Sequence, residues 1–113
     1  MDVKDYQGGT FLREYIYVLK LIPRLHEEKN WTKREEDIVT LHFQRLKKFC
    51  EEGKVFTAGR TDHTDRGGFG IVIFLAENEE KALDFMNEDP AVKEGIMEAE
   101  LFPYRTALVK TVS

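Results

Sequence analysis

His42 is the residue of this sequence best suited to chemistry, because it interrupts an apolar pattern. Ile38, Leu41, Leu46 and Phe49 recur at helical spacing, and His42 falls within their stripe. An imidazole on an apolar face needs a hydrogen-bond partner, and near neutral pH it can act as a general base. The alternative is a core histidine bonded to a backbone carbonyl or to water. The residues alone leave both interpretations open.

Asp89 is a second candidate because of its place next to Pro90, at the end of a predicted helix. The residue before proline is pushed out of the helical region, so this pair ends a helix. The macrodipole disfavours a carboxylate at a helix C-terminus. Asp89 is therefore either a plain helix stop or a carboxylate kept there for another purpose.

Three further side chains are candidates for substrate binding. Arg24 and Arg105 could hold a carboxylate or an enolate through two parallel hydrogen bonds, although solvated arginines are common. Tyr17 could line a cleft, with core packing as the alternative. Residues 62–65 offer oxygen and nitrogen groups to a metal, but no second cluster matches them, so a turn is expected there.

Composition limits the classes of protein that this chain can belong to. Its 113 residues are 42% hydrophobic and 34% charged, which suits one folded domain. The net charge of −4 argues against binding nucleic acid or anionic lipid through a general positive field. The longest apolar run, residues 71–76, is far shorter than the ~20 residues of a membrane-spanning helix.

The cellular compartment is predicted from two further features. The single cysteine, Cys50, excludes an internal disulfide framework and fits a reducing cytoplasm. The first residues contain no apolar stretch typical of a signal peptide. We therefore expect a cytoplasmic protein that does not contact a membrane.

The elements that position these residues follow from local patterns. Residues 1–10 are polar and are predicted to form a flexible tail before a single domain over 11–113. Thr32 and Glu35 form a capping box that begins a helix of about 20 residues, and Gly53 suits its end. Asn78 begins a second helix, which ends at Asp89. Strands are predicted at residues 14–22, 55–59, 69–75 and 96–109.

The order βαββαβ predicts an α+β fold of the ferredoxin-like type. Its four-stranded antiparallel sheet carries two helices on one face, and right-handed crossovers place the first and third strands in the centre. Residues 15–19 and 69–74 are apolar on both faces. Helices cover only one face, so we expect a second subunit or a ligand on the other.

An RNA-recognition motif has the same topology. Residues 16–21 and 67–74 resemble its two signature strands. However, Gly67 stands where that motif has a basic residue, and Ile71 where it has a stacking aromatic. Nucleic acid is therefore the less favoured partner.

Several spaced blocks together carry a different resemblance. Residues 42–59 (HFQRLKKFCEEGKVFTAG), residues 87–95 (NEDPAVKEG), the segment 100–105 (ELFPYR) and the pair 23–24 resemble the YciI-like (YCII-related) family. The blocks span roughly residues 15–107, so the resemblance is far more specific than a single motif. It implies membership of the dimeric α/β barrel superfamily, in which two ferredoxin-like sheets pack face to face in a homodimer.

The resemblance also implies a site between the sheet and the helices. In it, His42 would move a proton and Asp89 would orient and stabilise the imidazole. Related barrels include lactone isomerases and cofactor-free oxygenases, so we expect a small enzyme, of isomerase or lyase type, acting on a small organic acid or cyclic metabolite. The alternative is a dimeric module that binds a small molecule without catalysis. No pattern in the sequence calls for a metal or an organic cofactor.

Overall fold

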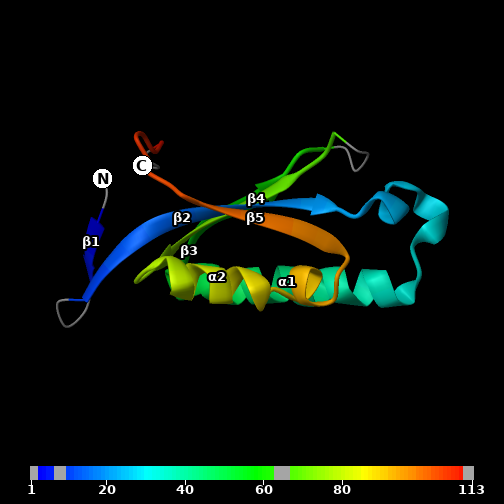
Figure 1. Ribbon diagram of the computed structural model, residues 1–113, viewed down its shortest axis with the longest axis horizontal. Helices are drawn as coiled ribbons and strands as arrows, with labels where there is room; N and C mark the ends of the chain where they lie inside the picture. Colours follow the sequence, from blue (N-terminus) through cyan, green and yellow to red (C-terminus); the bar gives the residue numbers. More distant parts are fainter. Residues whose placement is uncertain (1–2, 7–9, 63–66, 111–113) are drawn as a thin grey trace.

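The computed structural model describes residues 3–6, 10–62 and 67–110 of the chain. In these residues an antiparallel sheet forms one layer, and helices packed on one of its faces form the other (Figure 1). The strands are β1 (Val3–Tyr6), β2 (Thr10–Leu21), β3 (Val55–Arg60), β4 (Gly70–Ala76) and β5 (Met97–Pro103). The helices are α1 (Lys33–Glu51), α2 (Glu79–Asn87) and α3 (Pro90–Lys93), with short 3-10 helices η2 (Pro23–His26) and η3 (Glu28–Asn30) before α1.

The sheet has the strand order of a ferredoxin-like fold. β2 and β4 are central, β3 lies outside β4, and β5 lies outside β2. Tyr17, in the middle of β2, is paired with Val72 on β4 and with Leu101 on β5. The predicted α+β class and the central position of the first and third predicted strands are therefore confirmed.

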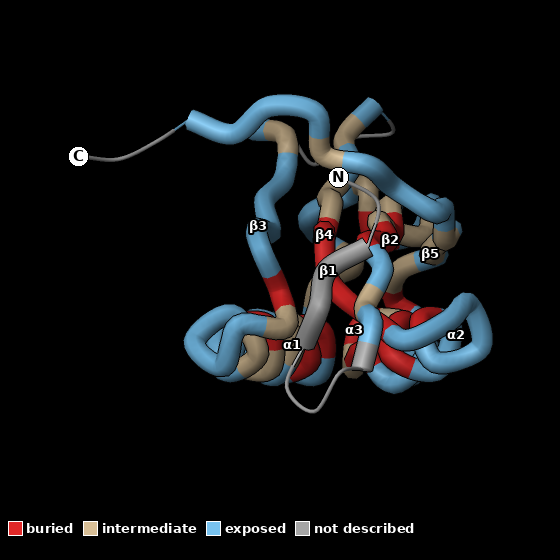
Figure 2. Tube along the Cα trace, turned by 90° about the vertical axis from the view of Figure 1, so that its left-hand side faces the viewer, coloured by how far each residue is buried: buried red, intermediate tan, exposed pale blue. Residues whose placement is uncertain are grey.

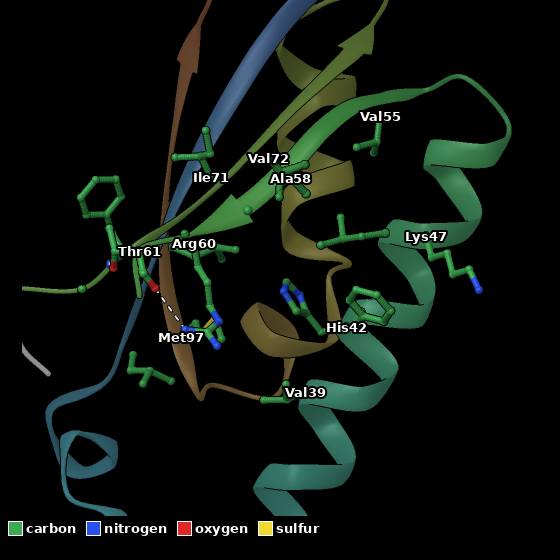
Figure 3. A pocket seen from close by; sticks show the side chains of 18 of the residues that line it. Val39, His42, Lys47, Val55, Ala58, Arg60, Thr61, Ile71, Val72 and Met97 are labelled. Atoms are coloured by element: carbon green, nitrogen blue, oxygen red, sulfur yellow. Dashed lines mark hydrogen bonds between the residues drawn. The ribbon is translucent and has the colours of Figure 1, made fainter. Parts of the chain in front are cut away.

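The beginning and the end of α1 follow the predicted signals. The hydroxyl of Thr32 and the carboxylate of Glu35 form the capping box, and the Thr32 amide donates to Glu35 Oε1 at 2.9 Å. After the helix, Gly53 adopts a φ of 88°, a left-handed conformation that favours glycine. Between these ends, α1 runs across the sheet and presents His42 toward it (Figure 3).

The main core lies between the sheet and the helices. Figure 2 shows the buried residues gathered where β2 and β4 face the helical layer. Aromatic rings fill its centre. The ring centroids of Phe74 and Phe85 are 4.7 Å apart in a stacked pair, and those of Tyr17 and Phe74 are 5.6 Å apart in an edge-on pair. A second, smaller cluster joins η2, α1 and α3; its buried members are Leu25, Ile38, Ala91 and Ile96.

The opposite face of the sheet is also apolar, as predicted. Ile16 on β2 is paired with Ile73 on β4 and with Phe102 on β5, and Val18 is paired with Ile71. Phe102 is 40% exposed. No helix among the described residues covers this face. Phe102 at its edge is accessible in a single copy of the chain, whereas Ile73 near its centre is 8% exposed.

The two ends of the domain differ from the prediction. Residues 3–6, predicted as part of a flexible tail, form β1 and pair with residues 10–13. The reason is that β2 begins earlier than predicted, at Thr10. Its first residues therefore have backbone N–H and C=O groups with which residues 3–6 can pair.

The last strand is shorter than predicted and ends at Pro103 rather than at residue 109. Its edge position agrees with the proline, which has no N–H to donate. Beyond it, Thr106 donates through its amide (2.9 Å) and its hydroxyl (2.7 Å) to the buried carboxylate of Glu14. The segment after Pro103 therefore bonds to a β2 side chain instead of extending the strand. Among the described helices, none combines the length and the apolar character needed to cross a membrane.

Candidate active site

His42 and Asp89 are in direct contact. His42 Nδ1 lies 2.6 Å from Asp89 Oδ1, although the two residues are 47 positions apart in the sequence. The Asp89 side chain is completely buried, whereas the imidazole is 14% exposed. The contact joins α1 to the turn between α2 and α3, so the fold itself creates it.

Asp89 accepts two further hydrogen bonds. The Tyr17 hydroxyl donates to Oδ2 at 2.7 Å, and the Ala91 amide donates to Oδ1 at 3.0 Å. The second bond makes Asp89 the N-cap of α3. The pair Asp89–Pro90 follows the end of α2 at Asn87, and Asp89 begins α3, so its charge lies at a favourable helix N-terminus rather than at the predicted C-terminus. The sequence missed this because α3 is only one turn long.

The surroundings keep Asp89 ionised. Burial alone would raise its pKa, but the hydrogen bond and charge of His42, with the bonds from Tyr17 and Ala91, outweigh burial and lower the pKa below the usual 3.8. For Tyr17, burial is the largest effect and the charge of Asp89 the next, and both raise the pKa of the phenol far above its usual value. At neutral pH Asp89 is thus an anion, and Tyr17 remains a hydrogen-bond donor.

An ionised carboxylate accepts hydrogen bonds and donates none. The proton between His42 and Asp89 therefore belongs to Nδ1 of the imidazole. In the neutral ring, Nε2 then carries a lone pair on the side away from Asp89. No described residue hydrogen-bonds Nε2, so this nitrogen is available to a ligand.

His42 lines a cavity of about 650 Å³ between α1 and strands β3 and β4. Figure 3 shows the His42 ring extending from α1 into this space, opposite the strands. Most of the other lining side chains are apolar; among them are Leu19, Val39, Leu46, Val55, Val72 and Met97. Neither Tyr17 nor Asp89 reaches the lining, so both act on the cavity through His42.

A comparison with protein-family models identifies residues 19–104 as a YCII-related domain. The chain belongs to this family. The match covers about three quarters of the sequence, including His42 and Asp89. Among curated proteins, a search finds no match to this chain.

In this YCII-related domain, the two arginines predicted to bind substrate lie away from the cavity. Arg24, which is half-exposed, bonds to Glu35 Oε2 at 3.3 Å beside the start of α1. Arg105 is exposed in the segment after β5. Neither residue lines the cavity. Sequence position could not show this, because both arginines lie in segments whose path depends on tertiary packing.

Tyr17 was a candidate for lining the cleft, with core packing as the alternative. Its ring is fully buried in the core, and its hydroxyl bonds to Asp89. Arg60 was not a candidate, yet it lines the cavity from the end of β3. The sequence did offer a signal for Arg60. It stands at the end of a predicted strand, and His42 interrupts the apolar stripe of the helix that faces it.

The described residues contain no group of three or more His, Cys, Asp and Glu side chains suited to holding a metal ion. The metal-ligand segment considered from the sequence, residues 62–65, falls outside the described residues except for Asp62. Cys50, on the cavity lining, is a free thiol.

Proposed function

We propose that this YCII-related protein is a cofactor-free enzyme that moves a proton on a small organic acid or cyclic metabolite. The observation that carries the proposal is the 2.6 Å contact between His42 Nδ1 and the buried Asp89, on a ring that lines a cavity. A structural histidine needs only one partner. This one has a fixed anion on one nitrogen and a ligand-sized space beside the other.

The arrangement supports general base catalysis. Nε2 of His42 accepts a proton from a carbon next to a carbonyl, and the electron pair of the C–H bond moves toward the carbonyl oxygen. The imidazolium that forms is stabilised by Asp89, whose carboxylate is held in place by Tyr17 and Ala91. Return of the proton to a different atom completes an isomerisation, and the apolar lining strengthens these charge interactions.

Proton exchange with solvent tests this proposal. Small ketones, lactones and keto acids are incubated with the protein in D₂O, and loss of the proton next to the carbonyl is followed by NMR. We expect wild-type protein to accelerate exchange of at least one of these carbon acids. The His42→Gln variant should reduce that rate by about 10²-fold or more, since general bases contribute ~10²–10⁴-fold.

His26→Gln is the matched control, because His26 belongs to η2 and does not line the cavity. Its exchange rate should equal that of wild type. An exchange rate that is the same in the His42→Gln variant and in wild type would contradict the proposal. Saturable binding of these compounds without any exchange would instead support the non-catalytic ligand-binding module.

We further propose that two copies pair through the apolar outer face of the sheet, as in the dimeric barrels that the family resemblance implies. Sedimentation equilibrium should give twice the chain mass. A charge in the middle of the face, Val18→Glu, should yield a monomer, whereas Leu83→Glu on the exposed side of α2 should not. A monomeric wild type that binds single-stranded RNA in a salt-dependent manner would favour the RNA-recognition alternative.

A further inference from the structure

We infer that the His42 cavity binds an amphipathic carboxylate, whose apolar body packs in the cavity and whose anionic group bonds to Arg60. This inference rests on the proposed proton transfer and names its substrate class. It replaces the predicted roles of Arg24 and Arg105 with that of a residue on the cavity lining.

The apolar body follows from the cavity wall. The sheet contributes Leu19, Val55 and Val72 to this wall, and α1 contributes Val39 and Leu46. A volume of about 650 Å³ lies within the range of small-molecule sites, ~300–1,000 Å³. Burying an apolar ring against such a wall removes apolar surface from water, which is favourable.

The anionic group follows from Arg60. Figure 3 shows the Arg60 side chain extending from the end of β3 into the space that the His42 ring enters from α1. Arg60 Nη1 donates to the Thr61 carbonyl at 3.1 Å, which restricts the guanidinium. A guanidinium has five N–H groups, and no carboxylate in the described part of the chain forms an ion pair with this one. Its remaining donors suit a carboxylate, which arginine binds through two parallel bonds.

Gly70 on β4 is the register partner of Arg60. A Cβ at residue 70 would lie 3.2 Å from the Gly59 carbonyl oxygen and 3.7 Å from Arg60 Cβ. The tight approach is to the Gly59 carbonyl oxygen, whereas 3.7 Å is ordinary van der Waals contact, so glycine at residue 70 relieves a backbone contact beside Arg60.

Two other charged side chains line the cavity, and both come from α1. Lys47 and Glu51 are exposed, as Arg60 is, but Figure 3 shows Lys47 directed away from the cavity. Arg60 is thus the lining cation directed toward His42. An anion on Arg60 places the rest of the ligand beside the imidazole, and the same guanidinium can stabilise the negative charge that grows on oxygen as His42 removes a proton.

Binding of three probes tests the inference: phenylacetate, its neutral analogue phenylacetamide, and acetate, which lacks the apolar body. Titrations are followed in ¹H–¹⁵N NMR spectra, which also report whether each variant is folded. We expect phenylacetate to bind wild type about 10-fold or more tightly than phenylacetamide, as a charge-assisted hydrogen bond is worth about that much. It should also bind more tightly than acetate, which has no ring to bury. Arg60→Gln should abolish the preference for acid over amide, and Lys47→Gln should retain it.

Three results would overturn the inference: equal binding of phenylacetate and phenylacetamide by wild type, no saturable binding of phenylacetate, or an unchanged acid preference in Arg60→Gln. His42→Gln separates this inference from the proposed function. That variant should keep the acid preference while losing proton exchange. An acid preference that depends on Arg60 in a protein without exchange activity would leave the binding site standing and remove the catalysis.

Discussion

Two buried carboxylates, Asp89 and Glu35, have similar surroundings and different consequences. The side chain of Asp89 is 0% exposed and that of Glu35 is 4% exposed, and each accepts several hydrogen bonds. Both have a lowered pKa; for Glu35 the hydroxyl of Thr32, followed by the Thr32 amide, lowers it to about 2. Burial and a shifted pKa therefore do not by themselves mark a catalytic carboxylate.

The difference lies in the partners. Glu35 receives its bonds from Thr32, three residues earlier, and from Arg24, eleven residues earlier. These groups only donate hydrogen bonds to the carboxylate, so the result is a stable helix start. One partner of Asp89 is an imidazole, a group that can accept and donate a proton, and this imidazole lines a cavity. The candidate site therefore differs from the helix start in one feature. A group that can carry a proton, the His42 imidazole, lies between the buried carboxylate and the cavity.

The largest effect that separates the two carboxylates should be on proton exchange. Asp89→Asn removes the charge that stabilises the imidazolium, so the exchange rate should fall by about 10²-fold or more. Glu35→Gln should leave that rate within about twofold, since Glu35 does not contact His42. Both rates are measured by NMR in D₂O. If the two variants lose exchange equally, the contrast between the sites is wrong.

A smaller effect is expected from the tyrosine that supports Asp89. Tyr17→Phe removes one hydrogen bond to a buried carboxylate, which should lower the free energy of unfolding by about 1.5–3 kcal/mol. It should also raise the pKa of Asp89, because the bond from Tyr17 helps to lower it. Tyr15→Phe is the matched control, since Tyr15 is a buried β2 tyrosine with no such bond. Urea unfolding of the two variants gives the comparison, and equal losses would contradict it.

The smallest effect concerns the acid stability of the helix start. The pKa of Glu35 is lowered on folding from 4.5 to about 2. Its stabilisation is therefore complete above pH 4.5 and is lost as the pH falls toward 2. Urea unfolding between pH 2 and 6 should show the largest difference between wild type and Glu35→Gln at the upper end, and a shrinking difference below pH 4.5. A difference that grows on acidification would reverse the assigned sign.

The same contrast explains what could be predicted from the sequence. Features that depend on neighbouring residues were predicted, and the structure confirms them. They are the capping box at Thr32 and Glu35, the glycine after α1 and the order of the main strands. The paired strand at residues 3–6 and the short end of β5 depend on which backbone groups other segments leave unpaired. Local patterns contain little of that information.

The candidate site was partly predictable for the same reason. His42 stands out because a polar ring interrupts an apolar stripe, and the family resemblance supplied Asp89 as its partner. The structure brings these two residues together. Arg60 was missed because a basic residue at a strand end is common, and only the fold shows that this one lines the cavity. Arg24 was assigned to substrate, although its partner Glu35 is fixed by the fold.

The proline after Asp89 has a consequence for the speed of any reaction at His42. Pro90 confines the preceding residue to extended backbone, and Asp89 indeed has φ −60° and ψ 126°. The carboxylate is consequently aimed at the imidazole before a substrate arrives. A preorganised anion of this kind does not have to reorient as charge develops, so little of the activation barrier is spent on rearranging the protein.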